Sequence, residues 1–217
     1  MSSLATIRPR IRNDLHDNDA TAYRWTDAVL DRHMQRAVQE YSFASPLETK
    51  TTLTTVANSR DVAVSTLTPR VRILAAEYPT GEYPPAYVPF TLWGDTLTLD
   101  IAEDVSGTPN VNVFWHKEHT IHATVDASTT FPTSHDDIIA TGAAAYAALE
   151  WASFASNRVN VGGDNVWGKY MDFANVRLQE FQERLRKLPA QAQVRTARLY
   201  TPADVRLRSQ TTDPGPV

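Results

Sequence analysis

The 217-residue chain contains no cysteine. This absence excludes disulfide scaffolds, cysteine-ligated zinc, iron–sulfur clusters and cysteine nucleophiles. Motifs for phosphate binding and for hydrolysis are missing as well: the sequence has no Walker A loop, no G-x-G-x-x-G, no G-x-S-x-G and no H-E-x-x-H. The sequence therefore predicts a protein that is not an enzyme and has no cofactor.

Long hydrophobic runs and a large excess of one charge are also absent. The first nine residues lack the apolar core of a signal peptide. The most apolar stretch, residues 138–156, is mostly alanine and includes Thr141, Glu150 and Ser153, which makes it too polar for a membrane span. The net charge of −4 gives no overall case for nucleic-acid binding. We expect a soluble protein of a reducing compartment.

The sequence does contain two hydrophobic periods in separate regions. A helical period over residues 7–15 and 26–41 predicts two N-terminal helices, with Thr26 as the N-cap of the second. The same period returns over residues 134–157 and 165–188, where we expect two long helices that form an antiparallel hairpin. Gly162 and Gly163 would break the chain between them, and Asp164 would cap the last helix.

Between the helices the period becomes two, and β-branched and aromatic residues dominate residues 50–122. About six short strands are expected there, in a small sandwich or half-open barrel. Trp93-Gly94-Asp95-Thr96 predicts a two-residue hairpin turn, because glycine supplies the positive φ. The expected fold class is α+β, with N-terminal helices in residues 1–45, an inserted antiparallel β domain in 46–130, a long helix hairpin in 131–190 and an extended C-terminal arm in 191–217.

The helix hairpin carries both small and aromatic residues at helical spacing. Small residues let another helix approach closely, and the aromatic side chains are more numerous than two helices can cover. Such surplus apolar surface favours side-by-side packing of subunits. The residues expected in this subunit packing are Gly142, Ala145, Tyr146, Leu149, Trp151, Trp167 and Tyr170.

Three histidines in the stretch HKEHTIH are the best metal-ligand candidates: His116, His119 and His122. Strand neighbours alternate faces, so His119 would point away from the other two unless a tight bend intervenes. A polar hairpin rim is therefore the favoured interpretation, and a metal-dependent hydrolase is the less favoured one.

Two acidic pairs are candidates for acid–base chemistry. Asp17 and Asp19 resemble part of a calcium loop but lack its glycine and distal glutamate. Asp136 and Asp137 are better explained as favourable charges in the first turn of a helix. We expect neither pair to be catalytic.

Aromatic residues of the β region suggest another class of function. Trp93, Trp115, Tyr83, Tyr87 and Phe90 are either a sugar-stacking platform or the core and edge of a small sandwich. A carbohydrate- or surface-binding module built on the β domain is therefore the alternative function.

The C-terminal region is strongly basic. Residues 184–208 contain seven basic residues and one acidic residue, a net charge of +6, so the rest of the chain carries −10. Apolar residues alternate with these charges, which favours docking on an acidic protein partner; a solvated tail and nucleic-acid contact are the alternatives. The residues expected to dock are Val194, Arg195, Arg198, Leu199, Tyr200, Val205, Arg206, Leu207 and Arg208.

The order of these elements and four stretches of sequence resemble the head-to-tail adaptor proteins (head–tail connectors, or neck proteins) of tailed bacteriophages. The stretches are RNDLHD at 12–17, YRWTDAVLDRH at 23–33, ATGAAAYAALEW at 140–151 and NRVNVGGDNVW at 157–167. The resemblance extends over residues 7–200.

The resemblance implies a structural virion protein of the neck, assembled in the host cytoplasm and without a membrane. Such adaptors form an oligomeric ring, usually of twelve copies, beneath the portal protein of the filled capsid. Their C-terminal arm docks on the portal, the opposite side meets a tail or nozzle protein, and DNA passes through the lumen without sequence-specific binding. The β insertion is larger here than in the mostly helical minimal members, so its position and its partner do not follow from the resemblance.

Overall fold

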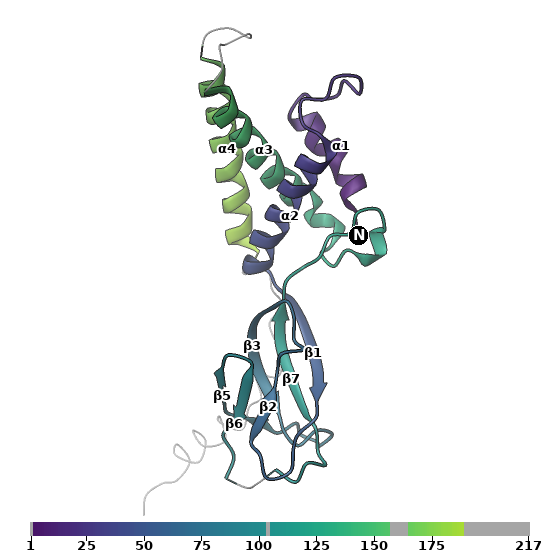
Figure 1. Cartoon of the computed structure of the whole chain (residues 1–217), viewed down its shortest axis with the longest axis vertical. Coiled ribbons are helices and arrows are strands. Elements are labelled where there is room, and N and C mark those ends of the chain that lie inside the picture. Colours follow the sequence, from purple (N-terminus) through teal and green to yellow (C-terminus); the bar gives the residue numbers. More distant parts are fainter. Residues whose placement is uncertain (1, 103–104, 157–164, 189–217) are drawn as a thin grey trace, which may run out of the picture.

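A computed structural model describes residues 2–102, 105–156 and 165–188 of the chain. These residues form a helical body and a β domain, one above the other in Figure 1. The helices are α1 (Leu4–Asp14), α2 (Asp27–Ala44), α3 (Asp136–Ser156) and α4 (Val166–Lys187), with 3-10 turns at Asp126–Ser128 and Thr133–His135. The strands are β1 (Leu47–Leu53), β2 (Asp61–Ala63), β3 (Arg70–Glu77), β4 (Tyr87–Val88), β5 (Phe90–Trp93), β6 (Thr96–Leu99) and β7 (Val111–Lys117). The α+β class is confirmed.

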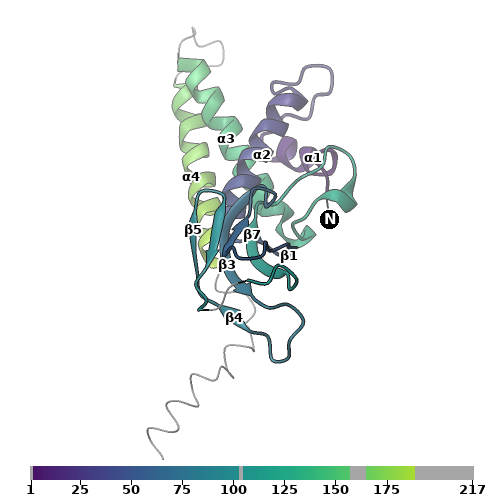
Figure 2. The ribbon, with the colours of Figure 1, turned by 60° about the horizontal axis from the view of Figure 1, so that its bottom comes forward.

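The long helices α3 and α4 lie side by side and run antiparallel, as predicted (Figures 1 and 2). Gly142 makes their contact possible, because a Cβ at this position would lie 2.9 Å from the ring of the fully buried Phe181 on α4. The residue at the N-cap position of α4 is Asn165, in the left-handed conformation with φ 56°. The expectation that Asp164 caps this helix is therefore wrong, and residues 157–164 lie outside the described residues.

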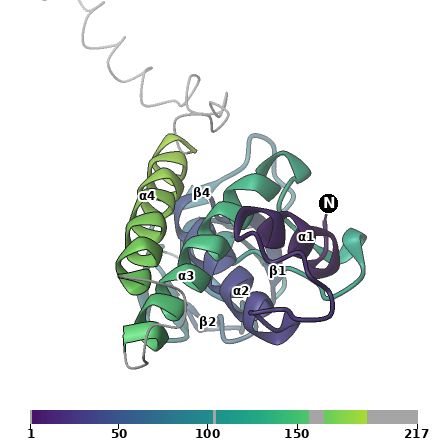
Figure 3. The same cartoon turned by 90° about the horizontal axis from the view of Figure 1, so that it is seen from above.

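Both ends of the described chain contribute to the helical body. Seen from above, α3 lies between α4 on one side and α1 and α2 on the other (Figure 3). A single hydrophobic core joins them through residues such as Ile7, Met34, Ile139 and Phe181. The N-terminal helices and the long hairpin are thus two halves of one folded unit, interrupted in sequence by the β domain.

The central helix α3 is apolar on nearly every side. With the turn that precedes it (Thr133–Ser156), it is long and apolar enough to cross a membrane by composition alone, but 67% of its most apolar window is buried inside the molecule. Such burial fits a helix surrounded by α1, α2 and α4.

The β domain consists of two antiparallel sheets, with strand orders β1-β7-β3-β4 and β2-β6-β5. Their facing sides bury Val62, Leu97, Val113 and Trp115 among others, so the small sandwich is confirmed. The predicted two-residue turn joins β5 to β6, with Gly94 at φ 57°. Pro89 separates β4 from β5, because proline cannot donate a hydrogen bond to a strand ladder.

The chain returns to the helical body directly after β7. The N–H groups of Leu4 and Ala5 donate to the carbonyls of His122 and Ala123, at 2.9 and 3.1 Å, and Phe131 lies in the helical core. The β domain was expected to extend to residue 130, but His119, His122 and Ala123 already bond to the helical body.

Candidate interaction surfaces

In the sequence the C-terminal arm follows α4, and the described residues stop at Leu188. Arg184, Arg186 and Lys187 occupy the last turn of this helix, where positive charge interacts favourably with the helix dipole. The nine residues expected to dock on a partner, Val194 to Arg208, lie outside the described residues. Their role stays a prediction.

Three of the residues assigned to subunit packing are interior residues of the chain. Gly142, Ala145 and Tyr146 are buried, and the Tyr146 ring packs edge-on against Phe181 and beneath the guanidinium of Arg36, 3.9 Å from the ring centroid. These three residues were expected to pack against a second subunit, but α2 and α4 of the same chain already cover them.

The other four, Leu149, Trp151, Trp167 and Tyr170, lie toward the far tip of the helix hairpin. Leu149, Trp151 and Tyr170 are half-buried against the helical core, whereas the Trp167 side chain is 45% exposed. The Arg24 guanidinium lies 5.0 Å from the Trp151 ring centroid and 5.6 Å from that of Tyr170, a cation–π arrangement. The exposed apolar side chains near this tip include Trp167 and Phe154.

The three candidate metal-ligating histidines do not converge. The ring of His116 lies beside Arg72, whose Nε donates to His116 Nδ1 at 3.1 Å. The Nδ1 atom of His122 accepts from the backbone N–H groups of Thr124 and Val125. Among the described residues, no group of three histidine, aspartate or glutamate side chains could hold a metal ion. The favoured interpretation, a polar hairpin rim, is wrong for two of them, because His116 is buried within β7 and His119 packs against the end of α2.

The third histidine, His119, joins the two segments that connect the body to the β domain. Its Nε2 lies 3.0 Å from the Ser45 carbonyl, so Nε2 carries the proton, and the Thr130 hydroxyl donates to Nδ1. Burial lowers the pKa of His119 below its ordinary value, which favours this neutral form. With both nitrogens engaged, the ring positions the two segments rather than acting as a base.

The candidate acid–base pairs are structural as well. Asp17 is buried and pairs with the buried Arg12 at 2.8 Å, while also accepting from the backbone N–H groups of Arg24 and Trp25. Asp136 accepts from the hydroxyl of Ser2, and the side chain of Asp137 pairs with Arg10 on α1. Asp136 and Asp137, which both pair with Arg10, join α3 to the N-terminal segment, and Asp17 joins the α1–α2 loop to α1.

The aromatic platform expected on the β domain is divided between the core and the surface. Trp115 is only 4% exposed and donates through Nε1 to the hydroxyl of Thr51 at 3.0 Å. Trp93 and Tyr83, by contrast, are 81% and 97% exposed. Trp115 therefore belongs to the sandwich interior and cannot stack on a sugar together with Trp93.

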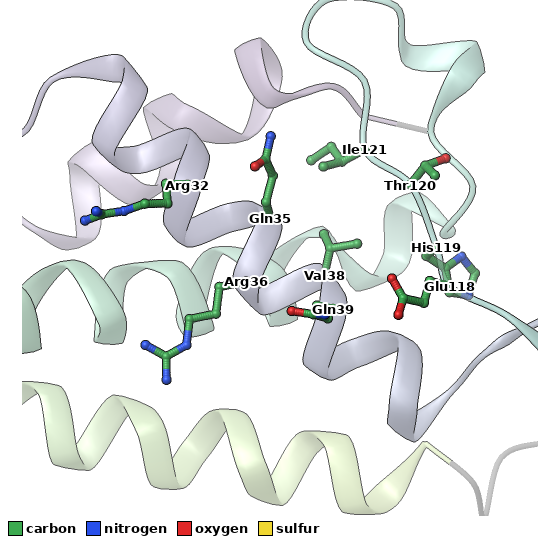
Figure 4. A pocket seen from close by; sticks show the side chains of 9 residues that line it. All are labelled: Arg32, Gln35, Arg36, Val38, Gln39, Glu118, His119, Thr120 and Ile121. Atoms are coloured by element: carbon green, nitrogen blue, oxygen red, sulfur yellow. The ribbon is translucent and has the colours of Figure 1, made fainter. Parts of the chain in front are cut away.

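One pocket was missed by the sequence analysis. It lies between α2 and residues 118–121 and has a volume of about 470 Å³ (Figure 4). Its polar lining comes mainly from Arg32, Gln35, Arg36, Gln39 and Glu118, and its apolar lining from Val38 and Ile121. No local motif could have indicated it, because its two walls are some eighty residues apart in the sequence.

The charged groups of this pocket already have partners in the chain. Arg32 pairs with Glu150 on α3 at 2.5 Å, and Arg36 lies 3.8 Å from Glu40 as well as over the Tyr146 ring. The pocket could therefore contact a polar segment of another protein through Gln35 and Gln39, but its arginines are not free to hold an anion.

Comparisons with known proteins identify no relative: no protein-family model matches the chain, and no curated protein matches it significantly.

Proposed function

We propose that this protein is a structural virion protein, a head-to-tail adaptor that forms a ring under the portal and joins the DNA-filled capsid to the tail. The observation that carries the proposal is the arrangement of the chain. A helical body made from both of its halves has a β domain at one end, and α4, which the basic segment follows in the sequence, ends beside the junction of the two (Figure 1). The sequence resemblance described above concerns the same arrangement.

The charge distribution supports docking through the arm. The region 184–208 carries +6 and the remainder −10, so an arm of one chain is attracted to acidic surfaces while the bodies are not drawn to DNA passing through a ring. The apolar residues Val205 and Leu207 would then supply the anchors that hold the docked part of the arm.

The engagement of polar side chains also supports a structural role. The candidate catalytic groups Asp17, Asp136 and His119 each have partners that fix the fold. Apolar surface at the hairpin tip, around Trp151 and Trp167, is the remaining candidate for contact between copies of a ring.

The test is mass photometry of the purified protein alone and after mixing with a portal ring. The full chain should form an oligomer and add mass to the portal, whereas a chain lacking residues 194–217 should keep its fold but lose the attachment. Changing Arg206 and Arg208 to Gln should weaken attachment, and changing them to Lys should preserve most of it, because the charge remains. A truncated chain that joins the portal with full affinity would refute the role of the arm.

The second candidate function is a carbohydrate- or surface-binding module on the β domain. The exposure of Trp93 and Tyr83 favours it, because aromatic rings facing solvent can stack on sugars. A glycan array with the wild-type protein and Trp93→Ala decides this question: a signal lost in the variant supports sugar binding, and the absence of any signal eliminates it.

A further inference from the structure

Strand β5 has a free edge. It lies at the end of the sheet β2-β6-β5 and pairs with β6 through a two-residue turn, with Trp93 opposite Thr96 and Leu92 opposite Leu97. In such a hairpin the two residues that flank the turn, Trp93 and Thr96, are hydrogen-bonded to each other. Along an antiparallel ladder, hydrogen-bonded pairs alternate with pairs that are not hydrogen-bonded, so the pairs of Leu92 and Phe90 with β6 are of the second kind. The N–H and C=O groups of Phe90 and Leu92 therefore point away from β6.

Two hydrogen bonds outside the hairpin ladder confirm this register. The N–H of Leu99 donates to the carbonyl of Arg60 at 2.9 Å, on the β2 side, and the N–H of Asp100 donates to Pro89 at 2.9 Å, on the β5 side. The backbone N–H groups of successive residues along β6 therefore point in turn toward β2 and toward β5. No described residue pairs with the outer edge of β5 in the sheet.

The side chains also indicate that a strand is missing at this edge. Val62, Leu97 and Leu92 follow one another across the inner face of the sheet, on β2, β6 and β5. The first two are buried, but Leu92 is 39% exposed. An additional strand beside β5 would cover Leu92 and give this sheet four strands, like the sheet opposite.

The other sheet edges are protected in ways that β5 is not. Natural edge strands avoid pairing with other chains by being short, charged or interrupted by proline. β1 carries Glu48 and Lys50, β2 has three residues including Asp61, and β4 has two residues followed by Pro89. β5, with the sequence Phe-Thr-Leu-Trp, has no charge.

We propose that residues 194–201 of this chain (VRTARLYT) add to the outer edge of β5 as a strand. This segment has β-branched and aromatic residues, no glycine and no proline, and Pro202 follows it. It belongs to the 29 residues that follow Leu188, and the end of α4 lies on the β5 side of the molecule, away from β1, in both Figures 1 and 2. The exposed Asp100, which follows β6 and donates its N–H to Pro89 just before β5, is opposite in charge to Arg195 and Arg198.

The added strand divides the arm into two parts. Residues 194–201 are held on the β domain, and residues 205–208 remain available for a partner. The assignment of the second part to the portal rests on the proposed function, whereas the strand itself does not, so a failure of portal binding leaves the strand untouched.

Hydrogen exchange measured by NMR tests the strand directly. The full chain is compared with a chain ending at Leu188, which retains both hydrophobic cores. The amide of Leu92 should exchange about tenfold faster or more in the shorter chain, because it loses a hydrogen bond and becomes exposed to water. The amides of Thr91 and Trp93, which bond to β6, should not change and serve as internal controls.

Limited trypsin digestion tests the same strand from the arm. Cleavage after Arg195 and Arg198 should be slower than after Arg206 and Arg208 in the wild-type protein, and Leu92→Pro should remove this difference. Proline is tolerated at Leu92 because its N–H faces the free edge. The matched control is Glu48→Pro on the edge strand β1. The N–H of Glu118 donates to Pro69, so the backbone groups of His116, two residues earlier, also point toward β3. Glu48 lies opposite His116, and its backbone N–H therefore points away from β7 into the free edge.

Three results would overturn the proposal. One is equally fast exchange of the Leu92 amide in both chains, and another is uniform cleavage of all four arginines in the wild-type protein. The third is equally slow exchange in both chains, which would show that a second copy rather than the arm covers β5.

Discussion

The helical body and the β domain reach a buried core by opposite routes. The body combines residues 4–44 with residues 131–188, and it joins the two halves by buried or half-buried charges such as Asp136 and the His33–Glu150 pair. The β domain uses one continuous segment, residues 47–117, whose apolar core lies beside the buried polar residues Glu77, Asn112 and His116. An insertion between α2 and α3 is tolerated because the sandwich needs nothing from the helices to bury its own faces.

The stability of the helical body depends on contacts between segments far apart in the sequence, whereas that of the β domain does not. In the body, α3 is covered by helices from both halves, so neither half can bury its apolar surface alone. In the sandwich, every strand pairs with another strand of the same continuous segment. Four predictions test this contrast between the helical body and the β domain, starting with the largest expected effect.

The largest effect is expected from separating the parts. A fragment of residues 46–118 should fold alone, with dispersed amide signals and a cooperative unfolding transition. A fragment of residues 131–188 should not form a stable monomer, because α1 and α2 no longer cover α3. Circular dichroism and NMR spectra of both fragments measure this, and a natively packed monomer of residues 131–188 would contradict the two-half description.

Next in size is the loss of a large side chain from the shared core. Phe181→Ala should lower the free energy of unfolding of the helical body by about 3–5 kcal/mol, because the ring is fully buried against α3. Val176→Ala, at an exposed position on the same helix, should cost about 0.5 kcal/mol or less. Urea denaturation measures both variants; equal midpoints would mean that α4 does not pack as described.

A comparable but smaller loss is expected at the buried ion pair. Asp17→Ala leaves Arg12 without its buried partner and should lower the free energy of unfolding by about 3 kcal/mol. The matched control is Asp19→Ala two residues away, in an exposed turn, which should leave the urea midpoint unchanged. If both variants unfold at the wild-type midpoint, the pair does not hold the α1–α2 loop.

The smallest effect is a dependence of stability on pH. Burial lowers the pKa of His33, His119 and His135 below the ordinary value of 6.5. As the pH falls, these histidines are therefore protonated at a higher pH in the unfolded chain than in the folded chain. The free energy of unfolding is at its full value above pH 6.5 and decreases as the pH drops below it. Urea midpoints between pH 8 and pH 5 should show this loss, and His119→Gln should reduce it. The fragment 46–118 lacks all three histidines and is the control. If the urea midpoint of His119→Gln changes with pH as much as that of the wild-type protein, His119 does not contribute to the pH dependence.

The sequence predicted most of the local structure correctly. Periodicity located α2, with Thr26 accepting from the N–H of Val29 at its start, and it located both long helices of the hairpin. The turn at Gly94 and the antiparallel β insertion were predicted from residues that lie close together in the chain. These features depend on neighbours within one or two turns, which the sequence displays directly.

The errors share a different physical cause. Tyr146 and Gly142 were expected to pack against a second subunit, but segments about a hundred residues upstream or some forty residues downstream cover them. His122 and Ala123 were assigned to the β domain, yet their carbonyls accept hydrogen bonds from the start of α1. Periodicity shows that a side chain will be buried without showing what buries it.

By itself, the amino-acid sequence determined the absence of cysteine chemistry, the order of helices and strands, and the concentration of basic charge in residues 184–208. Only the tertiary structure decided which apolar faces are covered, since this depends on contacts between distant segments. It brought α1 and α2 onto α3, buried Trp115 while leaving Trp93 at the surface, and left the outer edge of β5 without a paired strand among the described residues. Composition and period are local properties, whereas burial is a property of the assembled chain.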